Sequence, residues 1–458
     1  MEEEYPETAS RLGKHMYVDD LVIGATDVQE AKKIAKEATE ILERAHMKLH
    51  KWASSDNDVR QFLQAESGER TLGDTKDMQK VLGLAWLPDE DVLTISMSDV
   101  WDMHQERGDT KRRVLQITAR VYDPLGMLAP FTVCARIFFQ LLWKRKVGWD
   151  DILPIELQPT WNQWCAELLH LQDLKVSRYS GQDKDADVVF TEIHIFCDAS
   201  PAAYGAVSYT VMEDSSGTKS PTMLMAKSRL APIKELTVPR LELMACLVGA
   251  RLASYITEKI QVTPVRRHLW TDSKINQSTN QSINQSINQS INQSDSKIAP
   301  CWIRGDPQRW KQFVHNRVKE IHERTRTTEW GYCNSKENPA DLLTRGISAR
   351  KLIESKTWWS GPSWLSEDES EWPGGSSDGD FAKDELEEKE SRHVLQTVTT
   401  VTDEVIDMRR FSTLKKLHKV MAWVFRFTEK ARKRSRQSGP LTAQELKEYR
   451  GPSKKISD

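Results

Sequence analysis

Residues 192–228 alternate hydrophobic and polar positions in three short segments, and this two-residue period is typical of β-strands with one buried face. Polar turns separate the segments, so we predict three antiparallel strands at residues 192–198, 204–211 and 222–228. The first strand places Ile193, Ile195 and Cys197 on one face, and His194, Phe196 and Asp198 on the other.

The period changes at residue 241, and from there apolar side chains recur at helical spacing. The apolar positions are 241, 244, 245, 248, 252, 255 and 256. Glu242 lies beside this stripe, and the small residues Cys246, Gly249 and Ala253 follow behind it. We expect the small side chains to let the helix approach the sheet closely and to direct Glu242 toward the strand ends. Residues 268–272 predict a further strand, parallel to the first by analogy.

The first 66 residues predict a hairpin, a helix and a second short strand. The hairpin covers residues 16–24, with Asp19 and Asp20 at its turn. Asp27 is placed to cap a helix whose apolar face consists of Val28, Ala31, Ile34, Ala35, Ala38, Ile41, Leu42 and Ala45. The strand covers residues 48–52. An Asp-Asp pair alone is an ordinary turn. Only the hairpin, helix and strand around it favour a functional interpretation.

Between these regions we predict a hairpin from residues 80–86 and 92–95, then helices over 111–121, 128–143 and near 161–171. The helical region is basic through Lys111, Arg112, Arg113, Arg120, Arg136, Lys144, Arg145 and Lys146. These side chains either contact a phosphate backbone or form a solvated helix face, and charge alone favours neither interpretation.

Four acidic residues lie at the ends of predicted strands or near the starts of predicted helices. Asp198 and Asp272 end strands, Glu242 begins a helix, and Asp341 lies in Asn-Pro-Ala-Asp at residues 338–341. Any one of them alone is an ordinary cap or turn residue, and Asp341 also fits a plain helix start. Their order resembles the acid set of the ribonuclease H-like fold. The resemblance implies two Mg²⁺ ions, with Mn²⁺ as an alternative, that activate water and stabilise the leaving 3′ oxygen.

Four further motifs occur in a fixed order. They are Leu-His-Lys-Trp at 49–52, Val-Leu-Gly-Leu-Ala-Trp at 81–86, Tyr-Asp-Pro-Leu-Gly-Met-Leu-Ala-Pro at 122–130 and Trp-Asp-Asp at 149–151. Together they resemble the Pol polyprotein of BEL/Pao-type LTR retrotransposons, from about residue 5 to the C-terminus. The resemblance implies an α/β (α+β) multidomain chain, in which a ribonuclease H-like mixed sheet with flanking helices follows a partial reverse transcriptase palm and thumb.

The resemblance also implies a division of the chain. The expected parts are a truncated palm at 1–66, a thumb and connection at 67–190, the ribonuclease H-like domain at 191–350, a Trp-rich closing segment with an acidic disordered linker at 351–407, and a basic helical pre-integrase segment at 408–458. Asp19 and Asp20 would be remnant polymerase acids. Only sixteen residues precede Tyr17, so we expect no polymerase activity, and no His/Cys set of an integrase follows.

The family implies cleavage of the RNA strand of an RNA–DNA hybrid, with the remaining Pol and Gag parts of a retroelement as partners. The hybrid would contact Arg304, Arg309, Trp310 and Lys311, although a solvated basic helix explains these residues equally well. A catalytically inactive nucleic-acid-binding remnant of a decayed retroelement is the alternative. The segment at 332–337 lacks the His that cellular ribonucleases H often carry, so we expect slow turnover, and we interpret His315 and His322 as surface residues.

A low-complexity repeat interrupts the acid set. Residues 275–294 are five near-perfect copies of Ile-Asn-Gln-Ser, which a tetranucleotide DNA repeat would encode, and we expect a disordered loop there. Asp-Ser-Lys-Ile occurs on both sides of the repeat, at 272–275 and 295–298. Because the strand fixes the position of a carboxylate, we choose Asp272 as the third acid, with Asp295 as its substitute.

The cysteines and the apolar runs of the sequence indicate the cellular compartment. The six cysteines form no C-x-x-C pair, which argues against a zinc site or a disulfide framework. We find no signal peptide and no apolar run of membrane-spanning length, so we expect an intracellular chain without a membrane partner. The location would be cytoplasmic, with the nucleus as an alternative because of the basic run at 432–436.

Overall fold

The computed structural model describes residues 4–68, 79–81, 84–95, 97, 100, 108–178, 188–259, 265–272 and 298–373, with separate positions between 413 and 442. The chain divides into two units, Met1–Arg392 and His393–Asp458. The predictions for the repeat, for Asp295, for the acidic linker and for most of the basic helical segment lie outside the described residues. In the part that is described, no helix is both long and apolar enough to span a bilayer.

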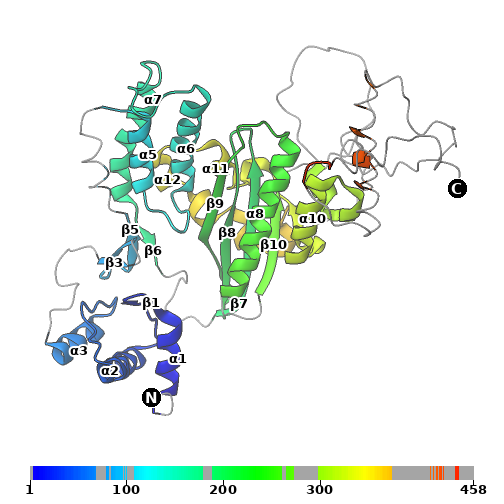
Figure 1. The fold of residues 1–458 in the computed structure, drawn as a ribbon. Coiled ribbons are helices and arrows are strands. Elements are labelled where there is room, and N and C mark those ends of the chain that lie inside the picture. Colours follow the sequence, from blue (N-terminus) through cyan, green and yellow to red (C-terminus); the bar gives the residue numbers. More distant parts are fainter. Residues whose placement is uncertain are drawn as a thin grey trace. The chain divides into compact units, whose positions relative to one another are not determined.

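A five-stranded mixed sheet is the centre of the first unit (Figure 1). Its strands are β7 (Val188–Ala199), β8 (Ala203–Asp214), β9 (Lys219–Leu230), β10 (Val265–Thr271) and β11 (Trp330–Tyr332), in the order β11-β10-β7-β8-β9. The pairs β7/β8 and β8/β9 are antiparallel, whereas β10 runs parallel to β7. The three antiparallel strands and the parallel fourth strand that the alternation predicts are confirmed.

One face of the sheet is covered by α8 (Val238–Lys259), and α9 (Ile298–Arg304) and α10 (Gln312–Arg324) pack beside it. Ile193, Ile195 and Cys197 of β7 share a hydrophobic core with α8. An added Cβ on Gly249 would lie 2.3 Å from Cys197 Sγ. The helix therefore approaches the sheet closely at a glycine, as the small-residue pattern predicts.

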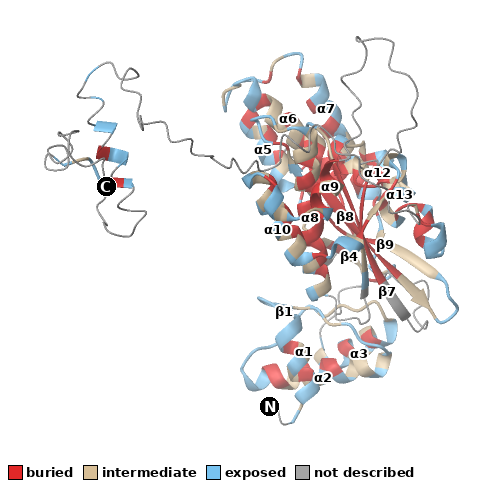
Figure 2. Cartoon of the chain, turned by 90° about the vertical axis from the view of Figure 1, so that its right-hand side faces the viewer, coloured by how far each residue is buried: buried red, intermediate tan, exposed pale blue. Residues whose placement is uncertain are grey.

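The other face of the sheet carries Phe196, Val207 and Tyr209. It packs against helices that come before the strands in the sequence and against helices that come after them. These helices are α5 (Lys111–Arg120), α6 (Ala129–Lys144), α7 (Gln158–Glu167), α12 (Ala349–Glu354) and α13 (Lys356–Ser360). One hydrophobic core joins residues from Met97 to Trp372, and Figure 2 shows β8 largely buried within it. The predicted connection and the predicted ribonuclease H-like region thus share one core.

The N-terminal residues form α1 (Pro6–His15), a hairpin of β1 (Met16–Tyr17) and β2 (Asp20–Leu21), α2 (Val28–Arg44) and α3 (Asn57–Ser67). Asp27 accepts hydrogen bonds from the backbone N–H groups of Gln29 and Glu30, so the predicted cap is confirmed. The strand predicted at residues 48–52 is wrong. That segment forms no strand, because Lys51 has a left-handed φ of +58° and Leu49 packs toward α1 and α2 instead.

A separate small sheet contains β3 (Gln79–Val81), β4 (Leu84–Leu87), β5 (Val92–Thr94) and β6 (Val176–Ser177). The predicted β4–β5 hairpin is confirmed. The pairing of β5 with β6 was not predicted, since β6 is two residues long and distant in sequence.

The basic cluster of α5 and α6 is largely occupied by the protein itself. Lys111 is 3% exposed, donates a hydrogen bond to the Val147 carbonyl and lies 3.5 Å from the Trp143 ring centroid. Arg112 pairs with Asp150, and Arg145 pairs with Glu156. The interpretation of Lys111 as a phosphate contact is therefore corrected, because its ammonium group is buried against an aromatic ring.

Candidate active site

The sheet topology brings two of the predicted acids to the same edge. Asp198 is the penultimate residue of β7, and Asp272 directly follows β10. The two strands run parallel with Cys197 opposite Thr271, so Asp198 and Asp272 follow at the same level. Carboxylates at the ends of adjacent parallel strands lie close together.

Asp198 is buried at this edge, with 8% of its surface exposed. The Thr344 hydroxyl donates a hydrogen bond to Asp198 Oδ2 at 2.6 Å. Burial, followed by the charges of Asp272 and Asp341, raises the pKa of Asp198 to about 7, and the Thr344 hydrogen bond acts in the opposite direction. Three carboxyl groups are therefore close enough for their charges to act on one another.

Asp341 reaches the edge because the segment before it is tied to β7. The Asn338 side-chain amide is buried, donates to the Cys197 carbonyl at 3.0 Å and accepts from the Ala340 N–H. Asp341 then begins α11 (Asp341–Arg345) and pairs with Arg345 at 2.6 Å. Burial raises the pKa of Asp341, and the Arg345 charge opposes this shift.

Glu242 approaches the same edge from α8. Because β9 runs parallel to β7, the chain leaves β9 at the edge that carries Asp198, and α8 must run back toward the start of β10. Glu242 lies in the early part of α8 and is half-buried. It lies about two turns before Gly249, and hence on the same helix face as the glycine that contacts the end of β7.

The sequence patterns did not identify Thr344 and Asn338 as site residues. Both are buried, and both bind β7 groups more than 140 positions earlier in the chain, Asp198 and the Cys197 carbonyl. The only sequence signal was their proximity to Asp341, since a hydroxyl or an amide side chain gives no pattern of its own.

The chemistry of the donors suits a hard divalent cation, because Mg²⁺ prefers carboxylate oxygens and a cation would relieve the repulsion that raises the pKa of Asp198. Among the described residues, however, no group of three His, Cys, Asp or Glu side chains converges as a preformed metal site. The acids thus meet at one edge without forming a closed set of ligands.

The predicted nucleic-acid contacts follow α9. Arg304, Arg309 and Lys311 are exposed. The prediction for Trp310 is corrected, because its side chain is 1% exposed and packs in the core beneath α8, where it offers no ring face to a ligand. His315 and His322 are half-buried rather than surface residues, and their rings bond to the carbonyls of Pro307 and Ile303.

The remnant polymerase acids lie apart from this edge in the sequence, in the β1–β2 hairpin, and both are exposed. The turn residues of the hairpin are Val18 and Asp19, because Tyr17 pairs with Asp20. Val18 has a φ of +56°, a strained conformation for a β-branched residue.

Comparison with known families identifies the region that contains the sheet. Residues 110–273 match the family model of the Pao retrotransposon-like RNaseH-like domain. The chain carries a Pao-type ribonuclease H-like domain. The match begins at the cap of α5 and ends beside Asp272, so the Pao-type domain contains the helices α5–α7 as well as the sheet through β10. The resemblance to BEL/Pao Pol is confirmed, and with it the ribonuclease H-like α/β fold.

Solved structures give weaker likenesses. A foamy viral protease–reverse transcriptase in complex with double-stranded DNA is 12% identical, with a TM-score of 0.38, over 72% of this chain and 48% of its own, so this chain spans about half of its length. The N-terminal ribonuclease H domain of a Mycobacterium tuberculosis protein, fused to maltose-binding protein, is 12% identical with a TM-score of 0.20 over 37% and 95% of the two chains.

Ribonuclease H1 from the halophilic archaeon Halobacterium salinarum is also 12% identical, with a TM-score of 0.20 over 36% and 97% of the two chains. The search of curated proteins found no match to this chain.

Proposed function

We propose that this chain is a retrotransposon Pol fragment that cleaves the RNA strand of an RNA–DNA hybrid by Mg²⁺-dependent hydrolysis. The observation that carries the proposal is the environment of Asp198. A carboxyl at a strand edge whose pKa is raised by burial, and further by two neighbouring carboxyls, is typical of a functional site. The Pao-type domain match supports the same reaction class.

The proposed role of each site residue follows from its position. Asp198, Glu242, Asp272 and Asp341 would hold the Mg²⁺ ions, which when bound activate water and stabilise the leaving oxygen. Thr344 would fix the Asp198 carboxylate by its hydrogen bond, and Asn338 would hold the Asp341 segment against β7. Arg345 pairs with Oδ1 of Asp341, so Oδ2 would be the oxygen of this carboxylate that binds a metal.

The proposed partner is an RNA–DNA hybrid. Arg304, Arg309 and Lys311 are exposed and would contact phosphates, and 2′-hydroxyl contacts would select the RNA strand. The foamy viral structure contains double-stranded DNA, which is consistent with a nucleic-acid partner for this group of proteins.

The test is cleavage of a hybrid with separately labelled RNA and DNA strands by the full chain in Mg²⁺. We expect cuts in the RNA strand only, and their loss in EDTA and in Asp198→Asn. Asp198→Asn keeps the size of the side chain and an acceptor for Thr344, so its loss of activity would report the carboxylate rather than misfolding.

A third form lacks residues 272–294 and joins Thr271 directly to Asp295. Cleavage only by this form would mean that the repeat silences the site and that Asp295 serves in place of Asp272. Hybrid binding by all forms without cleavage would contradict the proposal and favour the inactive nucleic-acid-binding remnant.

A further inference from the structure

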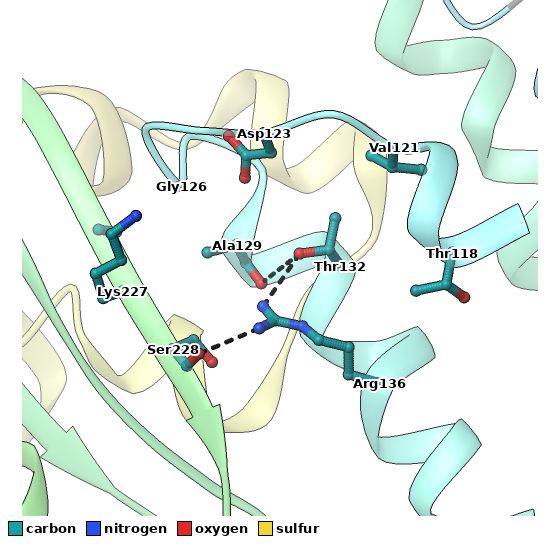
Figure 3. Close-up of a pocket in the computed structure, with 10 residues that line it drawn as sticks. Thr118, Val121, Asp123, Gly126, Ala129, Thr132, Arg136, Lys227 and Ser228 are labelled. Atoms are coloured by element: carbon teal, nitrogen blue, oxygen red, sulfur yellow. Dashed lines mark hydrogen bonds between the residues drawn. The ribbon is translucent and has the colours of Figure 1, made fainter. Parts of the chain in front are cut away.

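A cavity of about 270 Å³ lies between the α5–α6 corner and β9 (Figure 3). Its lining comes from three places: α5 with the corner after it, the first half of α6, and β9. Its polar side chains belong to Thr118, Asp123, Thr132, Arg136, Lys227 and Ser228. None of the four candidate acids of the sheet edge lines it.

The corner is built to approach β9. Gly126 has a φ of +76°, and an added Cβ would lie 2.1 Å from the Ala226 carbonyl oxygen. The Ala226 N–H donates to the Leu125 carbonyl at 2.8 Å, which ties the corner to the strand. These contacts fix one wall of the cavity by backbone rather than by mobile side chains.

Arg136 places a guanidinium in this cavity. Its two terminal nitrogens donate to the Ser228 carbonyl at 3.1 Å and to Thr132 Oγ1 at 3.2 Å (Figure 3). Its Nε is buried and has no hydrogen-bond partner in the described part of the chain. Burial lowers the pKa of Arg136, and the charge of Asp123, which also lines the cavity, opposes this shift.

The neighbouring polar groups of the lining include an unpartnered hydroxyl, a second positive charge and one carboxylate. Thr118 Oγ1 is likewise buried and lacks a hydrogen-bond partner among the described residues. The Lys227 ammonium donates to the Pro124 carbonyl at 3.1 Å and adds a second positive charge. Asp123, the carboxylate of the lining, accepts from the Leu128 N–H at 2.9 Å and forms no ion pair with Arg136 within the described residues.

We propose that this cavity binds a small anion that carries a phosphate or carboxylate group, with Arg136 as its counter-ion. A guanidinium with free N–H groups matches the oxygens of such anions, and charge-assisted hydrogen bonds are about twice as strong as neutral ones. The Thr118 hydroxyl would donate to the same group. The volume is near the lower end for small-molecule sites, so the ligand is a small metabolite or a free inorganic anion rather than a polymer.

The proposal is tested by calorimetric titration of the full chain with three probes: inorganic phosphate, a nucleoside 5′-monophosphate and malonate. The buffer contains EDTA, so that metal at the sheet edge does not contribute, and sodium chloride holds the ionic strength constant. We expect saturable binding of at least one probe at one site. Tighter binding of the nucleotide than of phosphate would identify a phosphorylated metabolite, and equal binding would identify the free anion.

Arg136→Met should weaken this binding roughly tenfold or more, because it removes the charged donor. The matched control is Arg112→Met, since Arg112 lies on the neighbouring helix, pairs with Asp150 and does not line the cavity. The control should bind the probe as the unmodified chain does.

Asp123→Asn provides the opposite test. It removes the competing carboxylate and keeps an oxygen for the Leu128 N–H, so it should tighten binding of the anion. It also decides the question if Arg136→Met fails to fold, as judged by circular dichroism. Absence of saturable binding for all three probes, equal binding by Arg136→Met, or unchanged binding by Asp123→Asn would overturn the proposal and leave Arg136 as a structural link between α6 and β9.

Discussion

At the scale of single residues, the sheet edge keeps Asp198 in surroundings that disfavour its charge. Its ordinary pKa of 3.8 applies to the unfolded chain, and the pKa of about 7 applies to the folded one. Between these values the folded chain retains a proton that the unfolded chain has lost. The free energy of unfolding therefore falls as the pH rises through this window.

Asp198→Asn should remove this pH dependence. In EDTA at pH 8 we expect the variant to be more stable than the unmodified chain, by on the order of a few kcal/mol, because the buried negative charge is gone. Near pH 4 the two should differ little, since Asp198 is then protonated in the fold. Thermal unfolding at the two pH values measures the difference, and equal differences at both would show that Asp198 has an ordinary pKa.

Thr344 is proposed to act through Asp198 rather than on the substrate. Thr344→Val removes the hydroxyl that donates to Oδ2, and a hydrogen bond to a charged group contributes about 1.5–3 kcal/mol. We expect the acidic limb of the pH–rate profile for hybrid cleavage to move upward by roughly one unit. Thr344→Ser should restore the profile, whereas a merely structural role would lower the rate without moving this limb.

The sequence suggested the candidate acids but not Thr344 and Asn338, the residues that bind beside them. Alternation along residues 192–198 was enough to place Asp198 on the face opposite Ile195, since the side-chain period of a strand is strict. Thr344 depends on a contact with a residue 146 positions away, which no local pattern contains. The same reasoning explains the wrong prediction for Trp310. Its charged neighbours suggested an exposed side chain, but the ring is buried in the core.

At the scale of elements, α8 positions Glu242 by packing on β7. Gly249→Ala would place a methyl group 2.3 Å from Cys197 Sγ, so the helix must move away from the sheet. We expect a loss of about 1–3 kcal/mol in the free energy of unfolding, together with weaker hybrid cleavage. Gly13→Ala in α1 is the matched control, because nothing lies within 4 Å of its added Cβ. Equal stability of the two variants would contradict close packing at Gly249.

Elements with long periodic patterns were predicted well, whereas the short strand predicted at residues 48–52 was wrong and the short strand β6 was not predicted. The helices α2, α5, α6 and α8 have amphipathic runs of ten residues or more, and each begins within three residues of the predicted start. The segment 48–52 has strand-like composition but no partner strand in the described N-terminal part. Composition alone does not form a strand without a neighbour to which its backbone can hydrogen-bond.

At the scale of the whole molecule, the closing Trp-rich segment completes the core on the second face of the sheet. Trp358 is fully buried, and its indole N–H donates to the Met127 carbonyl at 2.9 Å. The Tyr209 hydroxyl donates in turn to the Trp358 carbonyl at 2.8 Å. The turn before α6, the sheet and the segment after α11 therefore pack together in one core, which a division of the sequence by motifs did not predict.

Trp358→Ala should lower the free energy of unfolding by about 3–5 kcal/mol, since it leaves a large cavity and an unpaired carbonyl. Trp423→Ala, at a position that is 48% exposed, should cost less than about 1 kcal/mol. Denaturant unfolding of the full chain measures both variants. Similar small losses would mean that the closing segment is dispensable for the core.

The central claim is that the acids at this sheet edge hold Mg²⁺. Calorimetric titration of the full chain with Mg²⁺ at pH 8, compared with Asp198→Asn, tests this claim without relying on catalysis. We predict a binding event that is present in the unmodified chain, lost in the variant, and accompanied by proton release when the pH is lowered to 7, because Asp198 must give up its proton. Identical isotherms for the two proteins would contradict the assignment of the metal site.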